Sequence, residues 1–365
     1  MAEEKLRFFY NDPKMVELRS AIRQMIGLEW QDDRENEEMF DTGSGIAAVY
    51  DKADLQEQLV KAIAAAEQPP AFDVSAFEDD EDKVITVMNL YNNILSEHPE
   101  YKYAYDFDVK LEENDVLRCA VAYMPYRTGA YPEGFTGTEI NGLSDLIRVA
   151  RQSLAKENIP IRIVDTSLKV DDMNMALQQV GGYILCQLNN DGTAITTVPQ
   201  GELTRDMAVE RMNETDEMAE RIYRETVHDG MSRYEKAEAL YSYLTENVMY
   251  DHRYYSEPSS MPYDSTTAYG ALRDNLAICG GYAQALKILF EKAEIPCITV
   301  SGNMGSENHM WDMAYLDGEW LYFDPTSDRG RAEYGFKHFG VAAEEMSGYT
   351  WHPEWYKPIA DSMCI

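Results

Sequence analysis

One dipeptide constrains the fold of this chain more than any other feature, because it predicts both a turn and a strand register. Residues 317–318 are Asp-Gly, and they separate the apolar-rich runs "HMWDMAYL" and "EWLYFDP". Asp-Gly between two such runs is a strong signal for a two-residue β-hairpin turn. A turn of this length pairs Leu316 with Glu319 and places Trp311 opposite Asp324. Pro325 then ends the second strand, since proline cannot donate to a continuing ladder.

The same register brings a histidine close to an acid. His309 lies two residues before Trp311, so both side chains project from one side of the predicted hairpin. Diagonal neighbours across a hairpin are about 7–8 Å apart at the backbone, within reach of an imidazole–carboxylate hydrogen bond. The turn therefore predicts a His309–Asp324 pair, provided that no bulge shifts the register. The alternative is a chance approach of a histidine and an aspartate in an ordinary hairpin.

A lone cysteine stands at the beginning of a predicted helix. After "AICGG", apolar residues recur at spacings of three and four from Tyr282 to Ala293, which is typical of a helix with one buried face. Cys279 falls at or just before the first turn, where free amide groups and the positive end of the helix dipole favour a thiolate. Gly280 leaves little bulk beside the sulfur, and amides at this helix end can donate to an oxyanion. Packing is the alternative role, and a nucleophile needs a base.

Three motifs together resemble the transglutaminase-like superfamily, whose members are papain-like cysteine enzymes. They are Cys279 followed by Gly-Tyr-Ala, His309 with Trp311 two residues on, and Asp324 in Asp-Pro-Thr. The resemblance extends over about residues 207–352. It implies an α+β fold in which the helix bearing the cysteine packs on a small antiparallel sheet. It also implies a nucleophile at Cys279, a general base at His309 and an orienting acid at Asp324.

The sequence departs from the family pattern in two places that bear on the site. Met310 and Asp312 replace a small residue and a frequent asparagine, neither of which is catalytic in the family. The glutamine that completes the oxyanion hole of papain-like proteases has no clear counterpart before Cys279. Tyr250 and the backbone amides at Cys279 and Gly280 are candidate substitutes. Trp311 is a further cleft candidate, which would cover the imidazole pair from water or simply pack in the core.

Residues 1–200 are predicted to form an α+β accessory domain of unknown role, and residues 201–365 the transglutaminase-like catalytic domain. The character of the sequence changes at 201, where long charged helical segments begin. Ser232 and Glu235 have the spacing of a capping box. Within the first 200 residues the patterns predict helices at about 12–25, 55–66, 84–97 and 143–154, strands near 117–123, 159–164, 182–188 and 193–199, and a surface loop over 126–145.

The composition of the chain argues against several classes of function. The 32 basic and 65 acidic residues give a net charge of −33, which disfavours binding to nucleic acid or to anionic membranes. The five cysteines form neither a disulfide framework nor a C-x-x-C pair, and no EF-hand spacing occurs. We therefore expect no metal and no cofactor. No signal peptide and no apolar run of spanning length is present, so a cytoplasmic location is expected, or an exported or cell-surface one if an N-terminal signal was removed.

These patterns lead to one main functional hypothesis and two alternatives. The main hypothesis is cysteine-dependent acyl transfer at an amide bond through a thioester, with hydrolysis by a protease or amidase as the favoured outcome. Transglutaminase-type cross-linking, or deamidation of glutamine, is the first alternative, because it shares the same first step. A non-catalytic binding or scaffold protein that keeps the fold is the second. The expected partner is a protein or peptide substrate.

Overall fold

A computed structural model describes residues 45–77 and 83–363 of the 365-residue chain. Its contacts divide these residues into two compact units, one formed by 45–77, 83–94 and 106–121 and the other by 95–105 and 122–363. The helix predicted at 12–25 lies outside the described residues. The predicted boundary near residue 200 falls inside the second unit, and the division into an accessory and a catalytic domain stays a prediction.

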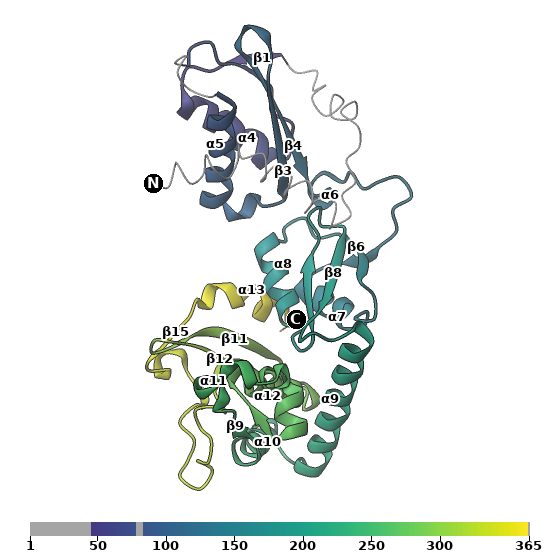
Figure 1. Cartoon of the computed structure of the whole chain (residues 1–365), viewed down its shortest axis with the longest axis vertical. Coiled ribbons are helices and arrows are strands. Elements are labelled where there is room, and N and C mark those ends of the chain that lie inside the picture. The colour runs from purple at the N-terminus through teal and green to yellow at the C-terminus, as the bar shows by residue number, and fades with distance from the viewer. Residues whose placement is uncertain (1–44, 78–82, 364–365) are drawn as a thin grey trace. The chain divides into compact units, whose positions relative to one another are not determined.

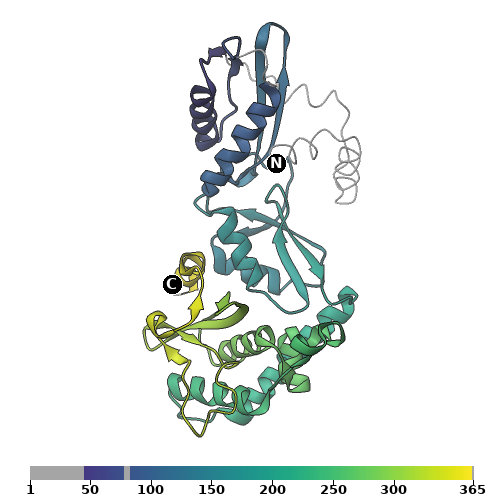
Figure 2. The same cartoon turned by 60° about the vertical axis from the view of Figure 1, so that its left-hand side comes forward.

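The first unit is a small sheet with two helices on one of its sides (Figures 1 and 2). Helix α4 (Lys52–Ala65) begins at Asp51, whose side chain accepts a hydrogen bond from the amide of Asp54. Helix α5 (Lys83–Glu97) is bound to the sheet through Tyr91, whose ring stacks on Phe107 at 4.4 Å. The strands are in the order β1 (Ile46–Ala48), β2 (Ala71–Asp73), β4 (Val116–Tyr123) and β3 (Ala104–Leu111).

The second unit opens with another four-stranded sheet, covered by helices α7 (Leu143–Arg151) and α8 (Val170–Gln178). Its order is β5 (Thr138–Ile140), β6 (Asn158–Ile163), β8 (Ala194–Pro199) and β7 (Ile184–Leu188). The strands predicted near 182–188 and 193–199 are present as β7 and β8, which pair antiparallel. The prediction of a loop over 126–145 was wrong in part. That segment contains the short helix α6 (Pro125–Thr128) and β5, which pairs parallel to β6 and is too short to show a period.

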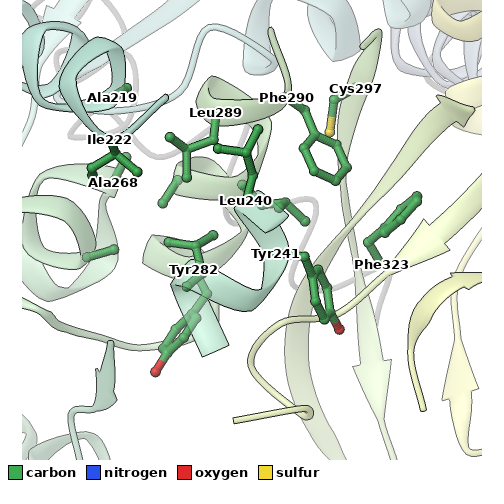
Figure 3. Packing of buried hydrophobic residues seen from close by; sticks show 14 of the residues in the cluster. Ala219, Ile222, Leu240, Tyr241, Ala268, Tyr282, Leu289, Phe290, Cys297 and Phe323 are labelled. Carbon is green, nitrogen blue, oxygen red and sulfur yellow. The ribbon is translucent and has the colours of Figure 1, made fainter. Parts of the chain in front are cut away.

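Three longer helices follow and build the core beneath the candidate site. They are α9 (Arg205–Thr226), α10 (Arg233–Asn247) and α12 (Cys279–Lys292). The capping box predicted at the start of α10 is confirmed, since Ser232 and Glu235 each bond to the other's backbone amide. In the core Phe290 and Tyr241 both meet Phe323 edge-on, with ring centroids 5.2 and 6.3 Å away (Figure 3). These contacts attach α12 and α10 to the neighbouring sheet.

That sheet has five antiparallel strands and carries the predicted hairpin. Its order is β14 (Phe339–Val341), β13 (Glu319–Phe323), β12 (Glu307–Leu316), β11 (Cys297–Met304) and β15 (Tyr349–Thr350). Leu316 pairs with Glu319, so the register predicted from the Asp-Gly turn is confirmed. Asp317 and Gly318 have φ angles of 53° and 97°, as a two-residue turn of this kind requires. Helix α12 packs against β11 and β12, which confirms the predicted α+β arrangement of a cysteine-bearing helix on a small antiparallel sheet.

The C-terminal helix α13 (Pro353–Met363) returns to pack against α7 and α8. Over residues 45–77 and 83–363, no helix is both long and apolar enough to span a bilayer.

Candidate active site

Cys279 is the first residue of α12 and differs in exposure from the other cysteines that the structure describes. It is partly exposed, whereas Cys119, Cys186 and Cys297 are buried. Burial raises the pKa of the Cys186 thiol to about 12, which keeps such a group protonated and inert. The helix begins at Cys279 because the carbonyl of Ile278 accepts the amides of Gly281 and Tyr282. The amides of Cys279 and Gly280 have no helical carbonyl one turn before them, as at every helix start.

The two glycines after the cysteine let the chain approach closely. A Cβ atom on Gly281 would lie 2.8 Å from the carbonyl oxygen of Thr267 and 2.7 Å from the Cβ of Ala277. A Cβ atom on Gly280 would lie 3.1 Å from the carbonyl oxygen of Thr266. Gly281 therefore cannot carry a side chain unless backbone moves, and the start of α12 is held against the segment before it.

The predicted imidazole–carboxylate pair is present. Nε2 of His309 lies 2.8 Å from Oδ2 of Asp324. His309 is 8 % exposed and Asp324 is fully buried, so water screens the pair little. Burial opposes the charged imidazole, but hydrogen bonds with Asp324 and Cys279 raise the pKa of His309 from 6.5 to about 9. Because Nε2 faces Asp324, Nδ1 is the nitrogen left for the Cys279 thiol.

Asp324 is kept ionised by a set of hydrogen bonds that the sequence analysis missed. Burial alone would raise the pKa of this carboxyl group, but the hydrogen bond and charge of His309, with hydroxyl donors from Ser327 and Tyr349, hold it below its ordinary value. The Ser327 and Tyr349 hydroxyls both lie 2.6 Å from Oδ2. The amides of Thr326 and Ser327 donate to Oδ1 at 3.0 and 3.2 Å.

Local sequence patterns indicate some of these partners of Asp324 but not others. Donation to a carboxylate by amides two and three residues on is a common local pattern of aspartate, so "DPTS" carried a signal for Ser327. Tyr349 lies 25 residues after Asp324 and reaches it only because β15 joins the edge of the sheet beside β11. No local pattern predicts that contact.

Aromatic side chains pack around the His309–Asp324 pair. Trp311 is fully buried, and its ring stacks on that of His309 with centroids 5.9 Å apart. Tyr349 and Trp351 both meet Trp311 edge-on, at 5.2 and 5.6 Å. Trp311 therefore lies against the imidazole, as one of its two predicted roles requires, and also packs in the core. An apolar surrounding of this kind strengthens the hydrogen bonds inside it.

Tyr250 lies beside the start of α12. It belongs to β9 (Met249–Tyr250), which pairs with β10 (Leu276–Ala277) so that Tyr250 is opposite Ala277. Its ring stacks on Tyr255 with centroids 5.9 Å apart, and the guanidinium of Arg329 lies 4.7 Å from its centre. Burial raises the pKa of Tyr250, and the hydroxyl of Tyr255 and the charge of Cys279 add to this effect. The phenol therefore stays protonated near the thiol and can donate.

A second histidine–aspartate pair lies next to the first. Nδ1 of His338 lies 3.3 Å from Oδ1 of Asp328. The other oxygen of this carboxylate, Oδ2, accepts hydrogen bonds from the backbone amide of His338 and the hydroxyl of Tyr241. Asp328 is fully buried. The His338 ring lies 5.5 Å from the ring of Tyr349. His338 is therefore a partner of a buried carboxylate.

Helix α12 also holds a buried amine and faces a buried acid. The Lys287 ammonium donates to the backbone oxygen of Gln179 and, at 3.2 Å, to its side-chain oxygen. Burial lowers the pKa of Lys287 to about 8. Asp312, where the family often has asparagine, is fully buried, and neither carboxyl oxygen has a hydrogen-bond partner among the described residues. Burial raises the pKa of Asp312 well above its ordinary value.

The segment that contains these residues matches a known family. Residues 220–325 match the model of the transglutaminase-like superfamily. The segment that carries Cys279, His309 and Asp324 is therefore a transglutaminase-like domain, of a superfamily of cysteine enzymes. No curated protein matches the chain.

Solved structures are similar only at a distance. One described as a TGase has 16 % identity and a TM-score of 0.31, covering 64 % of this chain and 66 % of its own. A second, described as a "Putative Cysteine Protease" from Cytophaga hutchinsonii, has 16 % identity and a TM-score of 0.26, covering 47 % of this chain and 70 % of its own. The chain thus spans just under two thirds of the first of these structures.

Proposed function

We propose that the protein is a cysteine-dependent acyl-transfer enzyme that acts on an amide bond, with Cys279 as nucleophile, His309 as general base and acid, and Asp324 as the orienting acid. The single observation that carries the proposal is the buried hydrogen bond of 2.8 Å between His309 and Asp324, in the domain whose helix starts with the partly exposed Cys279. A nucleophile, a base and a group that orients the base are the parts that this chemistry needs.

In each step of the reaction, His309 passes a proton between Cys279 and the reacting groups of the substrate or acceptor. His309 takes the thiol proton at Nδ1, and the Cys279 sulfur attacks the carbonyl carbon of the substrate amide. The C–N bond breaks as the imidazolium returns its proton to the leaving amine, which produces a thioester and a neutral imidazole. His309 then accepts a proton from the acceptor, whose attack breaks the C–S bond and restores the thiol. Asp324 stabilises the imidazolium in both steps without being protonated itself.

The negative oxygen of the tetrahedral intermediate needs donors, and the start of α12 supplies the best candidates. The amides of Cys279 and Gly280 begin the helix, where the dipole favours negative charge. The protonated phenol of Tyr250 is the third candidate, because Cys279 contributes to its electrostatic surroundings. These are the donors that the sequence predicted.

Hydrolysis is the favoured outcome. The partial exposure of Cys279 supports it, since water has access to the thioester. Cross-linking by an amine acceptor, and deamidation of glutamine, share the first step and differ only in the substrate and the acceptor. The substrate is a protein or peptide. Residues 1–200 act as an accessory domain to the catalytic residues 201–365, and the Lys287–Gln179 and Arg151–Glu291 contacts link residues of the two parts.

One experiment tests the proposal and separates its outcomes. The protein is incubated with a peptide library with and without a primary amine, and mass spectrometry detects cleavage, a gain of about one mass unit by deamidation, or amine incorporation. The wild type is expected to cleave, and Cys279→Ala is expected to be inactive. Cys186→Ala, which removes a buried thiol, is the matched control and keeps activity.

A second measurement addresses the non-catalytic alternative. Iodoacetamide is expected to modify Cys279 at pH 6 at least about ten times faster than a model thiol, because only the thiolate reacts. Equal rates, with no product in the library assay, would leave a binding or scaffold protein as the better interpretation.

A further inference from the structure

The candidate site is not complete within the segment that matches the superfamily. That match ends at residue 325, one residue after Asp324. Among the described residues, the two hydroxyl groups that hold the Asp324 carboxylate belong to Ser327 and Tyr349, which both lie beyond that match. Tyr349 belongs to β15, which pairs with the end of β11 at Met304 and Asn303.

The three strongest donors to Asp324 converge on one oxygen atom. Oδ2 is approached by His309 Nε2 at 2.8 Å and by the hydroxyls of Ser327 and Tyr349, each at 2.6 Å. The two hydroxyls also lie 2.9 Å from each other. O–H···O⁻ bonds of 2.5–2.7 Å belong to the charge-assisted class, which is about twice as strong as neutral hydrogen bonds.

We propose that Tyr349 is a positioning residue of the catalytic site, which works with Ser327 to hold the Asp324 carboxylate ionised and aimed at His309. The proposal rests on the proposed role of His309 as base. It extends the functional site to the tail of the chain, beyond the segment that the superfamily model covers.

The surroundings of Tyr349 suit a donor that does not move. The residue is 8 % exposed, and its ring contacts those of His309, Trp311 and His338. Burial raises the pKa of the Tyr349 hydroxyl, and the charge of Asp324 adds to this effect, so the proton stays on the phenol. A protonated phenol at this position can only stabilise the ionised form of Asp324.

Several other titratable groups lie close to the same region. Cys279 from α12 and Asp324 act directly on His309. Four other groups influence Asp324 or Tyr349 electrostatically or through a ring contact. They are Asp312 on β12, Asp328 in the turn after β13, His338 before β14, and Tyr241 on α10. The variants below leave all of them in place.

The test is a pH titration of the His309 imidazole by NMR in the full-length protein with labelled histidines, with the signal assigned through His309→Gln. Tyr349→Phe removes one oxygen and keeps the ring. It is expected to lower the pKa of His309 by about one unit, because the carboxylate is no longer held toward Nε2 and the hydrogen bond that stabilises the imidazolium is lost in part. The rate of Cys279 alkylation at pH 6.5 is expected to fall about tenfold. At pH about 10 the rates converge, since the thiolate then forms without help from the imidazolium.

Tyr356→Phe is the matched control. Its hydroxyl is also buried in the C-terminal tail and bonds to the backbone of Ser301, accepting from the amide at 2.9 Å. It is expected to leave the His309 titration unchanged. If Tyr349→Phe does not fold, Ser327→Ala tests the joint role of the two hydroxyls, because it removes the other hydroxyl on Oδ2. An unchanged His309 titration in that variant would count against the proposal.

Two outcomes are distinguishable. If the His309 titration curve of Tyr349→Phe is the same as that of the wild type, the positioning role is overturned. A lower Tm of the variant would then show that Tyr349 contributes only to packing. If wild-type Cys279 reacts no faster than a model thiol, the proposed acyl transfer fails, but the His309 titration still decides whether Tyr349 acts on the pair.

Discussion

Replacing Asp324 by asparagine tests the centre of the proposed site. The change keeps the size of the side chain but removes its charge. If the new amide nitrogen takes the place of Oδ2, it meets three donors, from His309, Ser327 and Tyr349. Asp324→Asn is therefore expected to lower the pKa of His309 sharply and to loosen the imidazole.

The magnitude follows from the pKa of His309. The difference between 6.5 and about 9 corresponds to about 3 kcal/mol of preference for the charged imidazole. A folded-state pKa above the unfolded value stabilises the fold fully below pH 6.5, and this contribution is lost as the pH rises through about 9. Asp324→Asn should therefore cost about 3 kcal/mol of unfolding free energy at pH 6, with a smaller loss at pH 9.5. At pH 7 the alkylation rate of Cys279 should fall about 100-fold.

The assay combines urea denaturation at pH 6 and 9.5 with iodoacetamide kinetics over the same range. Asp328→Asn is the control, because Asp328 is an equally buried carboxylate four residues on whose partners are His338 and Tyr241. It is expected to destabilise the protein without changing the alkylation profile. The reasoning is refuted if Asp324→Asn alkylates at the wild-type rate, or if its loss of stability is the same at both pH values.

Three further predictions concern the start of α12, the buried acid on β12 and the cap of α10. Gly281→Ala should lower stability by about 1–3 kcal/mol and slow alkylation, because the new methyl group meets the carbonyl of Thr267 at 2.8 Å; unchanged melting by circular dichroism would contradict the close approach. Asp312→Asn should raise the unfolding free energy at pH 8 by about 1–3 kcal/mol and have little effect near pH 4. Because the pKa of Asp312 is raised in the folded protein, the stability of the wild type falls as the pH rises. A variant less stable than the wild type at pH 8 would instead indicate that Asp312 is ionised and paired with Lys287. Ser232→Ala should cost about 1 kcal/mol by chemical denaturation with unaltered alkylation; an effect on the rate would argue against a purely local cap.

Local signals sufficed for the parts of the fold that short-range physics controls. The Asp-Gly turn has φ angles that few other residue pairs tolerate, so it predicted the register that pairs Leu316 with Glu319. Because side chains alternate along a strand, that register was enough to place His309 beside Asp324. The apolar spacing after Cys279 likewise located the start of α12, and the motif pattern supplied the superfamily that residues 220–325 match.

Only the tertiary structure decided which long-range partners complete the site. Tyr349 reaches Asp324 because β15 joins the edge of the sheet, and the Lys287 ammonium is held by Gln179, the residue that follows α8. Strand β5 was also missed, because it is too short to show a period and is held by its pairing with β6. Such contacts join residues far apart in the chain, and their free energy depends on burial and on exclusion of water, which no residue spacing encodes. The sequence by itself determined the helix start, the hairpin and the His309–Asp324 pair, and the assembled fold determined how strongly that pair is held.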